Sequence, residues 1–141
     1  MLVSGTHGVE GHCGSGAQVD WLRRGEAVRR AGNVAVMVVH AINPYGFAWS
    51  RRVTHENVDL NRNFIDFGKA LPENPAYDVL HPAVKPQAWT EAARNESRAI
   101  LLGYAREHGF PALVQAMSGG QYRHPDGIFY GGSGETWSRR T

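Results

Sequence analysis

The run Val34-Ala-Val-Met-Val-Val-His-Ala-Ile42 is an almost continuous apolar stretch. Its length and its β-branched residues are typical of a strand buried on both faces, as in a parallel sheet. Asn43-Pro-Tyr-Gly46 ends the run in a turn. Met1-Leu-Val3 has the character of a second, minimal strand, and a segment with helical spacing separates the two. Strand, helix, strand, loop and helix in this order predict an α/β fold with right-handed crossovers.

Two longer segments show helical spacing. Val9 to Arg30 carries apolar residues at intervals close to three and four, although its glycines weaken the pattern. Pro86 to His108 is the clearer helix, and Gly109 is a typical stop signal. Pro111 to Met117 fits either one further helical turn or a short strand.

The remaining segments and the composition suggest a single domain. We expect residues 43 to 86 to form a long loop region and residues 119 to 134 to be irregular and glycine-rich. The 141 residues with 42% hydrophobic content fit one globular domain, or most of one. The net charge of +2, with arginines spread in pairs, is that of a solvated surface and argues against a nucleic-acid partner.

Targeting signals are not evident in the sequence. No stretch reaches the roughly 18 apolar residues of a membrane span, and the start lacks a signal-peptide pattern. The lone Cys13 excludes an internal disulfide and suits a reducing compartment. We therefore expect a cytoplasmic protein without a membrane partner.

His7 and Glu10 lie three residues apart in Ser4-Gly-Thr-His-Gly-Val-Glu-Gly11. A neutral imidazole and a carboxylate at this spacing can bind one zinc ion from a strand end and the first turn of the next helix. Glycines at such a helix start let backbone N–H groups approach a ligand closely. The segment therefore predicts two ligands of a zinc site.

Asn61 and Arg62, in Asn57-Val-Asp-Leu-Asn-Arg-Asn-Phe64, form a second group. An amide beside a guanidinium is well suited to grip a carboxylate. Sites in open α/β sheets lie at the carboxyl ends of strands, where His7 follows the first strand and Asn43 the second. The spacing of these motifs along the chain is consistent with one pocket.

Three segments in this order resemble the zinc carboxypeptidase superfamily: Thr6-His-Gly-Val-Glu-Gly11, Asn43-Pro-Tyr-Gly-Phe47 and Val58-Asp-Leu-Asn-Arg-Asn-Phe64. Residues 120 to 132 and 136 to 138 also resemble a bacterial branch of uncharacterised carboxypeptidase-like proteins, related to aspartoacylase and succinylglutamate desuccinylase. The resemblance runs over nearly the whole chain. It implies part of a phosphorylase/hydrolase-like mixed sheet flanked by helices.

The resemblance also implies roles for individual residues. His7 and Glu10 match the first two zinc ligands, and Asn61 and Arg62 match the pair that binds the terminal carboxylate of the substrate. An arginine that polarises the scissile carbonyl matches Arg51 or Arg52, and we favour Arg52.

The third zinc ligand and the general base of the family lie on later segments that this sequence does not contain. Both ends also look cut, so we expect residues 1 to 141 to be the N-terminal part of a single metallohydrolase domain, truncated at both ends. The complete site implies a zinc-dependent hydrolase, acting on a peptide or N-acyl amino acid at an amide bond next to a carboxylate. Its partners are then zinc and a small carboxylate-bearing substrate or peptide.

Two other functions stay open. One is a metal-free module that binds carboxylates through Arg52, Asn61 and Arg62. The other is a nonfunctional fragment, for which we expect an exposed apolar edge along Val34–Ile42.

Simpler structural roles are available to the site residues. His7 could cap the helix start, with Glu10 favoured there by the helix dipole. Arg62 could pin the long loop through Asp59 or Asp66. We interpret Asp59 itself as support for His7 or for an arginine.

The other candidate ligands are expected to be structural. We interpret His40 as a core residue of its strand, His55 as half of a solvated pair with Glu56, and His124 as a loop stabiliser in its His-Pro-Asp-Gly turn. His124 is the one candidate for an improvised third ligand. Cys13 is expected to pack rather than react.

Overall fold

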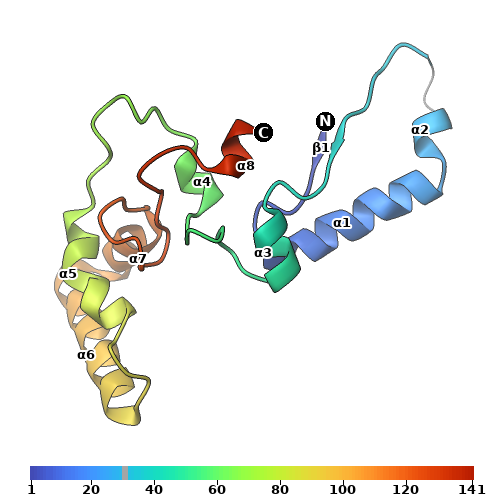
Figure 1. Cartoon of the computed structure of the whole chain (residues 1–141). Helices are drawn as coiled ribbons and strands as arrows, with labels where there is room; N and C mark the ends of the chain where they lie inside the picture. Colours follow the sequence, from blue (N-terminus) through green and yellow to red (C-terminus); the bar gives the residue numbers. More distant parts are fainter. Residues whose placement is uncertain (30–31) are drawn as a thin grey trace. The chain divides into compact units, whose positions relative to one another are not determined.

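The structure is a computed structural model that describes residues 1–29 and 32–141. It is mostly helical, with a small two-stranded parallel sheet (Figure 1). The chain divides into two compact units. Unit 1 comprises Met1–Glu56 and Trp137–Thr141, and unit 2 comprises Asn57–Thr136. The α/β class is therefore confirmed, with far less sheet than the sequence suggests.

Unit 1 holds the sheet. Strand β1 (Leu2–Val3) pairs in parallel with β2 (Val38–Val39), so that Leu2 lies opposite Val38. Between them run α1 (Gly8–Arg23) and α2 (Glu26–Arg29), and α3 (Pro44–Trp49) follows β2. The last helix of the unit is α8 (Trp137–Arg140). The parallel pairing joined by a helix is the crossover that the sequence predicts.

The predicted helix from Val9 to Arg30 is present but divided. A positive φ of 69° at Gly25 separates α1 from α2, since this left-handed conformation cannot continue a helix. Arg30 lies outside the described residues. Cys13 is exposed on α1, so the expectation that it packs is wrong.

The prediction of a strand buried on both faces along Val34–Ile42 is wrong. Only Val38 and Val39 form a strand, and Val34 and Met37 are 66% and 62% exposed. A strand is buried on both faces only when helices cover both. Here β2 has β1 as its partner, and the Gln18 side chain from α1 lies across the pair, donating to the carbonyls of Leu2 and Val39. The exposure expected along Val34–Ile42 is therefore present at Val34, Val36 and Met37.

His40 is not a core residue of the strand. It follows β2 and is exposed, and its Nδ1 atom lies 3.0 Å from Ser4 Oγ. The ring packs edge-on against Phe47, with 4.8 Å between the ring centroids. The burial that the apolar run suggests does not occur at His40, although its neighbours Val39 and Ala41 are half-buried.

Unit 2 is a helical layer with a long irregular segment. Its helices are α4 (Leu60–Asn63), α5 (Pro75–Val84), α6 (Glu91–His108) and α7 (Phe110–Ser118). Helices α5, α6 and α7 lie side by side (Figure 1) and bury Leu80, Leu113 and Ala116 between them. Residues 119–134 form neither helix nor strand beyond one bridge between Gln121 and Tyr130, as predicted.

The predicted loop from residue 43 to 86 is wrong, because α3, α4 and α5 lie in it. Two of these helices begin at an Asn-Pro pair. The side-chain oxygens of Asn43 and Asn74 accept from the backbone N–H groups of Gly46 and Tyr77. The following prolines occupy the first turn, where a missing N–H costs nothing.

The remaining helix predictions hold with shifted ends. Helix α6 begins at Glu91 rather than Pro86, since the hydroxyl of Thr90 caps it by accepting from Ala93 N at 3.2 Å. It ends before Gly109, as predicted. Pro111 to Met117 belongs to α7 and is helical. Among the described residues, no helix combines the length and apolar character needed to cross a membrane.

Candidate metal and substrate site

His7 stands between the end of β1 and the start of α1. It occupies the N-cap position of α1 in an extended conformation, yet its side chain makes no capping hydrogen bond. The capping role considered for His7 is therefore wrong. The imidazole is only 10% exposed, and its Nδ1 atom lies 3.5 Å from Oε1 of Glu10 in the first turn of the helix.

Gly8 fixes this helix start through a very close approach of α1 to α3. Its N–H donates to the carbonyl of Arg51 at 2.8 Å. A Cβ atom at Gly8 would overlap the carbonyl oxygen of Gly46, and one at Gly46 would overlap the side chain of Asn43. Both glycines are therefore needed for packing, and the position of His7 depends on that packing.

Arg52 extends from this same region toward the carboxylate. Its Nη1 atom lies 3.8 Å from Glu10 Oε1. Its backbone carbonyl accepts from Asn43 Nδ2 at 3.4 Å, so the buried Asn43 ties the arginine loop to the start of α3. Arg51 is exposed and contributes its carbonyl to Gly8. The structure thus brings His7, Glu10 and Arg52 together within unit 1.

The distance between His7 and Glu10 is suitable for zinc. Two donors that each lie about 2.1 Å from one tetrahedral zinc ion are themselves roughly 3.4 Å apart. The 3.5 Å separation of the imidazole nitrogen and the carboxylate oxygen matches this value, and the donor types are those that zinc prefers. Within residues 1–29 and 32–141, no group of three or more His, Cys, Asp or Glu side chains converges on one point. His7 and Glu10 therefore fit two of the four coordination positions of a tetrahedral zinc ion.

Asn61 and Arg62 belong to unit 2, on the short helix α4. The Arg62 guanidinium donates to the carbonyls of Ser118 and Asn61 and lies over the ring of Phe129. These bonds use two of its five N–H groups. The pairing with Asp66 that the sequence allows does not form, because Asp66 pairs with Lys69.

Asp59 starts α4 and is fully buried, and its side chain accepts from the backbone N–H of Asn61. Asn63 closes the same helix. Its amide donates to the carbonyls of Gly131 and Gly134 and its oxygen accepts twice from Thr136. The position of the Asn61–Arg62 pair thus depends on buried polar contacts on both sides.

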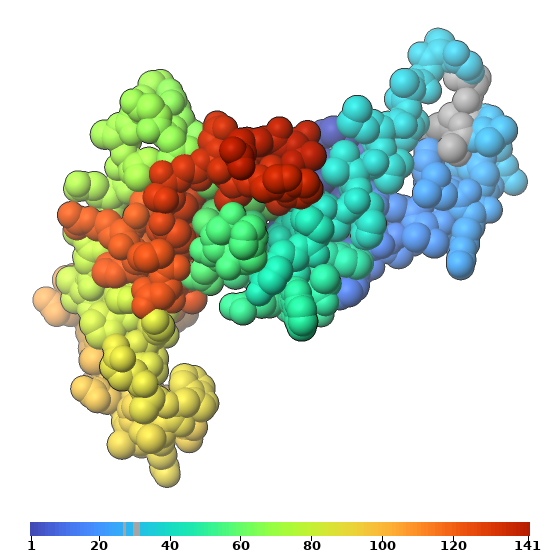
Figure 2. Space-filling model, viewed as in Figure 1, coloured from blue at the N-terminus to red at the C-terminus, as the bar shows by residue number. Residues whose placement is uncertain are grey.

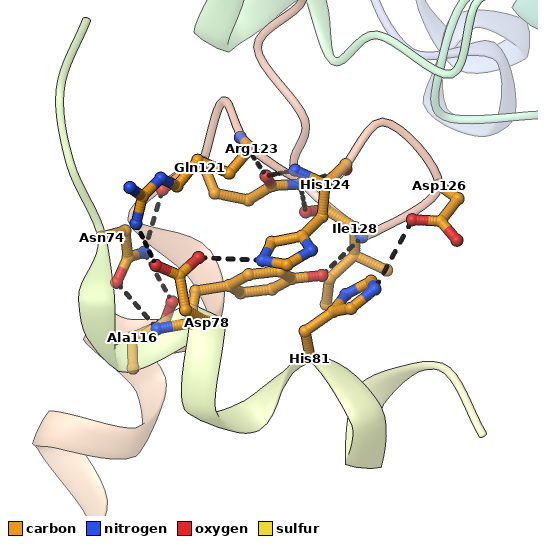
Figure 3. Close-up of polar contacts among 11 residues, drawn as sticks. Asn74, Asp78, His81, Ala116, Gln121, Arg123, His124, Asp126 and Ile128 are labelled. Atoms are coloured by element: carbon orange, nitrogen blue, oxygen red, sulfur yellow. Dashed lines mark hydrogen bonds and ion pairs between the residues drawn. The ribbon is translucent and has the colours of Figure 1, made fainter.

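A cluster of histidines and carboxylates in unit 2 was not predicted from the sequence (Figure 3). Asp78 on α5 accepts from Arg123 at 2.8 Å and lies 2.8 Å from His124 Nε2. The ring of His124 stacks on that of His81 with 4.0 Å between centroids. These contacts confirm His124 as a loop stabiliser. No local spacing in the sequence signals this cluster, because its contacts join α5 to residues 123–126.

The charged and buried groups of this cluster shift the pKa values of Asp78 and His81. The bonds from Arg123 and His124 hold the pKa of Asp78 below its usual range. Burial, and then the nearby charge of His124, lower the pKa of His81, whose Nδ1 atom is buried and has no hydrogen-bond partner among the described residues. His81 Nε2 faces Asp126, which also pairs with Lys85. The cluster therefore attaches the irregular segment to α5.

His55 is the remaining histidine with a predicted role. Its Nδ1 atom lies 3.2 Å from Glu56 Oε2, and both side chains are exposed. The prediction of a solvated pair is confirmed.

The chain is similar in sequence to part of a known carboxypeptidase. Carboxypeptidase SOL1 of Arabidopsis thaliana is 34% identical over 80 residues, which cover 56% of this chain. The match spans 16% of the length of that relative. No solved structure matches the chain significantly. A family profile described as a protein of unknown function, DUF2817, matches residues 1–141, and the chain therefore belongs to the DUF2817 family.

Proposed function

We propose that this chain carries the first two zinc ligands and the electrophilic arginine of a metallohydrolase. The observation that carries the proposal is the convergence of His7, Glu10 and Arg52 at the start of α1, with a donor separation that suits zinc. The similarity to a carboxypeptidase supports hydrolysis as the reaction class. The fold proposed for the whole protein is the carboxypeptidase-like mixed sheet.

His7 and Glu10 would hold the ion, and zinc bound there would supply the Lewis acidity that activates water and polarises a carbonyl. Arg52 donates to a carbonyl oxygen that gains negative charge during attack. A well-placed donor of this kind contributes on the order of 3–4 kcal/mol to the transition state. Within unit 2, the remaining N–H groups of Arg62 and the amide of Asn61 are suited to bind a carboxylate group. The proposed substrate is thus a peptide or N-acyl amino acid cleaved at an amide bond next to a carboxylate.

The test is a zinc titration followed by NMR of the imidazole nitrogens, because each of the seven histidines gives its own signals even when binding is weak. We expect the His7 signals to move first, with saturation, and expect His7→Ala or Glu10→Gln to remove the effect. His55→Ala is the matched control, since it removes an exposed histidine that also lies beside a glutamate. Zinc shifts that persist in His7→Ala would contradict the assignment.

Binding and hydrolysis are assayed with zinc on N-acetylated amino acids and on the same compounds with the carboxylate amidated. We expect the free acids, and not the amidated compounds, to bind in the presence of zinc. Turnover also requires a third zinc ligand and a general base, which residues 1–141 are not expected to supply. Binding of the free acids that is unchanged without zinc and in His7→Ala would favour the carboxylate-binding module instead.

A further inference from the structure

Unit 2 contains a groove of about 530 Å³ that is separate from every residue assigned above. The volume lies in the range of small-molecule pockets. The floor of the groove is apolar and comes from α5, α6, α7 and the irregular segment: Ala83, Val84, Leu101, Leu102, Met117 and Ile128. Figure 2 shows the residues that lead into α6, drawn in yellow, at the surface of the molecule.

The groove has an apolar end and a cationic end, because one face of α6 supplies both. Arg94, Ser97, Arg98, Leu101 and Leu102 line it at positions i, i+3, i+4, i+7 and i+8 of one helix. Arg94 lies near the start of the helix, and Arg98, Leu101 and Leu102 follow toward and at its middle. At a rise of 1.5 Å per residue, about 12 Å separates the first arginine from the last leucine.

The cationic end has no anionic partner in the described part of the chain. Arg94 and Arg98 are exposed, and neither takes part in an ion pair there, whereas Arg24, Arg52 and Arg123 all do. Arg94 lies over the ring of Trp89, with 5.6 Å from Cζ to the ring centroid. The indole is 75% exposed and stacks with the guanidinium, and both side chains line the groove.

We propose that this groove binds a monocarboxylate with a medium-length apolar chain. The carboxylate pairs with Arg94 and Arg98, and the positive end of the α6 dipole adds to the attraction near Arg94. The apolar chain lies along Leu101 and Leu102 toward Met117. The finite length of the groove favours a free amphipathic acid over an extended lipid surface.

The experiment uses decanoate below its micelle concentration, with decanol and butyrate as probes that lack the charge or the chain. Binding is measured by calorimetry and by the methyl NMR signals of Leu102 and Met117. We expect one saturable site for decanoate and at least tenfold weaker binding of both other probes. The double variant Arg94→Gln/Arg98→Gln should lose at least tenfold in decanoate affinity. Arg106→Gln, on the same helix but outside the groove, should bind as the unaltered chain does.

Equal affinity for decanol and decanoate would overturn the proposal, because the arginines would then not recognise the carboxylate. Unchanged binding in the double variant, or no saturable binding at all, would overturn it too. Binding to anionic phosphatidylglycerol vesicles without binding of monomeric decanoate would instead identify a membrane-facing surface. The helical circular dichroism of each variant verifies that α6 is intact.

Discussion

Arg52 Nη1 lies 3.8 Å from Glu10 Oε1, so the predicted electrophilic arginine pairs with the carboxylate of a predicted zinc ligand. The same carboxylate oxygen lies 3.5 Å from His7 Nδ1. A cation therefore already occupies the neighbourhood in which zinc would bind. This arrangement links metal affinity to the charge at position 52.

Replacing Arg52 by Gln should strengthen zinc binding by a few-fold, because it removes a positive charge that repels the ion. At a separation of several ångströms in water this repulsion is on the order of 1 kcal/mol. Arg52→Lys keeps the charge and should bind zinc as the unaltered chain does. Both are measured by the His7 imidazole signals during titration, and a loss of zinc binding in Arg52→Gln would show that the arginine positions a ligand instead.

Gly8→Ala should destabilise unit 1 by about 2–4 kcal/mol, because its Cβ would overlap the carbonyl of Gly46. Gly16→Ala in the same helix is the matched control. A Cβ there meets nothing within 4 Å, and alanine should stabilise the helix by about 0.5–1 kcal/mol. Urea unfolding gives both values. Equal and small effects at the two positions would mean that α1 and α3 are not in close contact.

Replacing Asn61 and replacing Arg62 should both weaken carboxylate binding, but only the replacement of Arg62 should lower the stability. The Asn61 side chain is exposed and forms no hydrogen bond among the described residues, so Asn61→Ala should leave stability within about 0.5 kcal/mol. Arg62→Ala removes the bond to Ser118 and the stacking on Phe129, and should cost about 1–3 kcal/mol. Both variants should weaken binding of a carboxylate such as N-acetylglycine, as calorimetry can measure. Unchanged carboxylate binding in Asn61→Ala would leave Asn61 outside the substrate site.

His81 should make unit 2 less stable in mild acid. Its pKa lies below the ordinary value of 6.5, so the unfolded chain binds this proton more readily than the folded one. The stabilisation is therefore present above pH 6.5 and is lost as the pH falls below it. His124, Asp78, Asp126 and Lys85 all act on this titration.

The test compares urea unfolding between pH 7 and pH 5 for the unaltered chain, for His81→Phe and for His108→Gln. His81→Phe keeps a ring against His124 and should flatten this part of the pH profile. His108 is exposed on α6, and its replacement should not change the profile. A further loss below about pH 4 is expected in all three, because the pKa values of Asp78 and Asp126 are also depressed.

The sequence predicts those features that depend on neighbours along the chain. The strand before His7, the helix after it and the end of α6 before Gly109 all follow from local patterns. The Asn-Pro pairs were ambiguous, since the same dipeptide marks a turn or the start of a helix. Tyr77 and Leu80 decide the case after Asn74, because both become fully buried, Leu80 against α6 and α7 and Tyr77 against the irregular segment 119–134.

Burial depends on partners that local patterns do not reveal. Val34 to Ile42 has the composition of an inner strand, yet its burial requires coverage that the described residues do not supply. The convergence of His7, Glu10 and Arg52 followed from motif order. The contact of Asp78 with His124 joins residues 46 positions apart and has no local motif, so it appeared only in the structure.

The hydrogen bond from Gly8 N–H to the Arg51 carbonyl connects the start of α1 to the residues that directly follow α3. His7 is one residue away from that bond, so we expect a displacement of α3 to displace its imidazole as well. Trp49 lies at the end of α3 and is 69% exposed, which makes the outer surface of unit 1 the place from which the proposed zinc ligand can be perturbed.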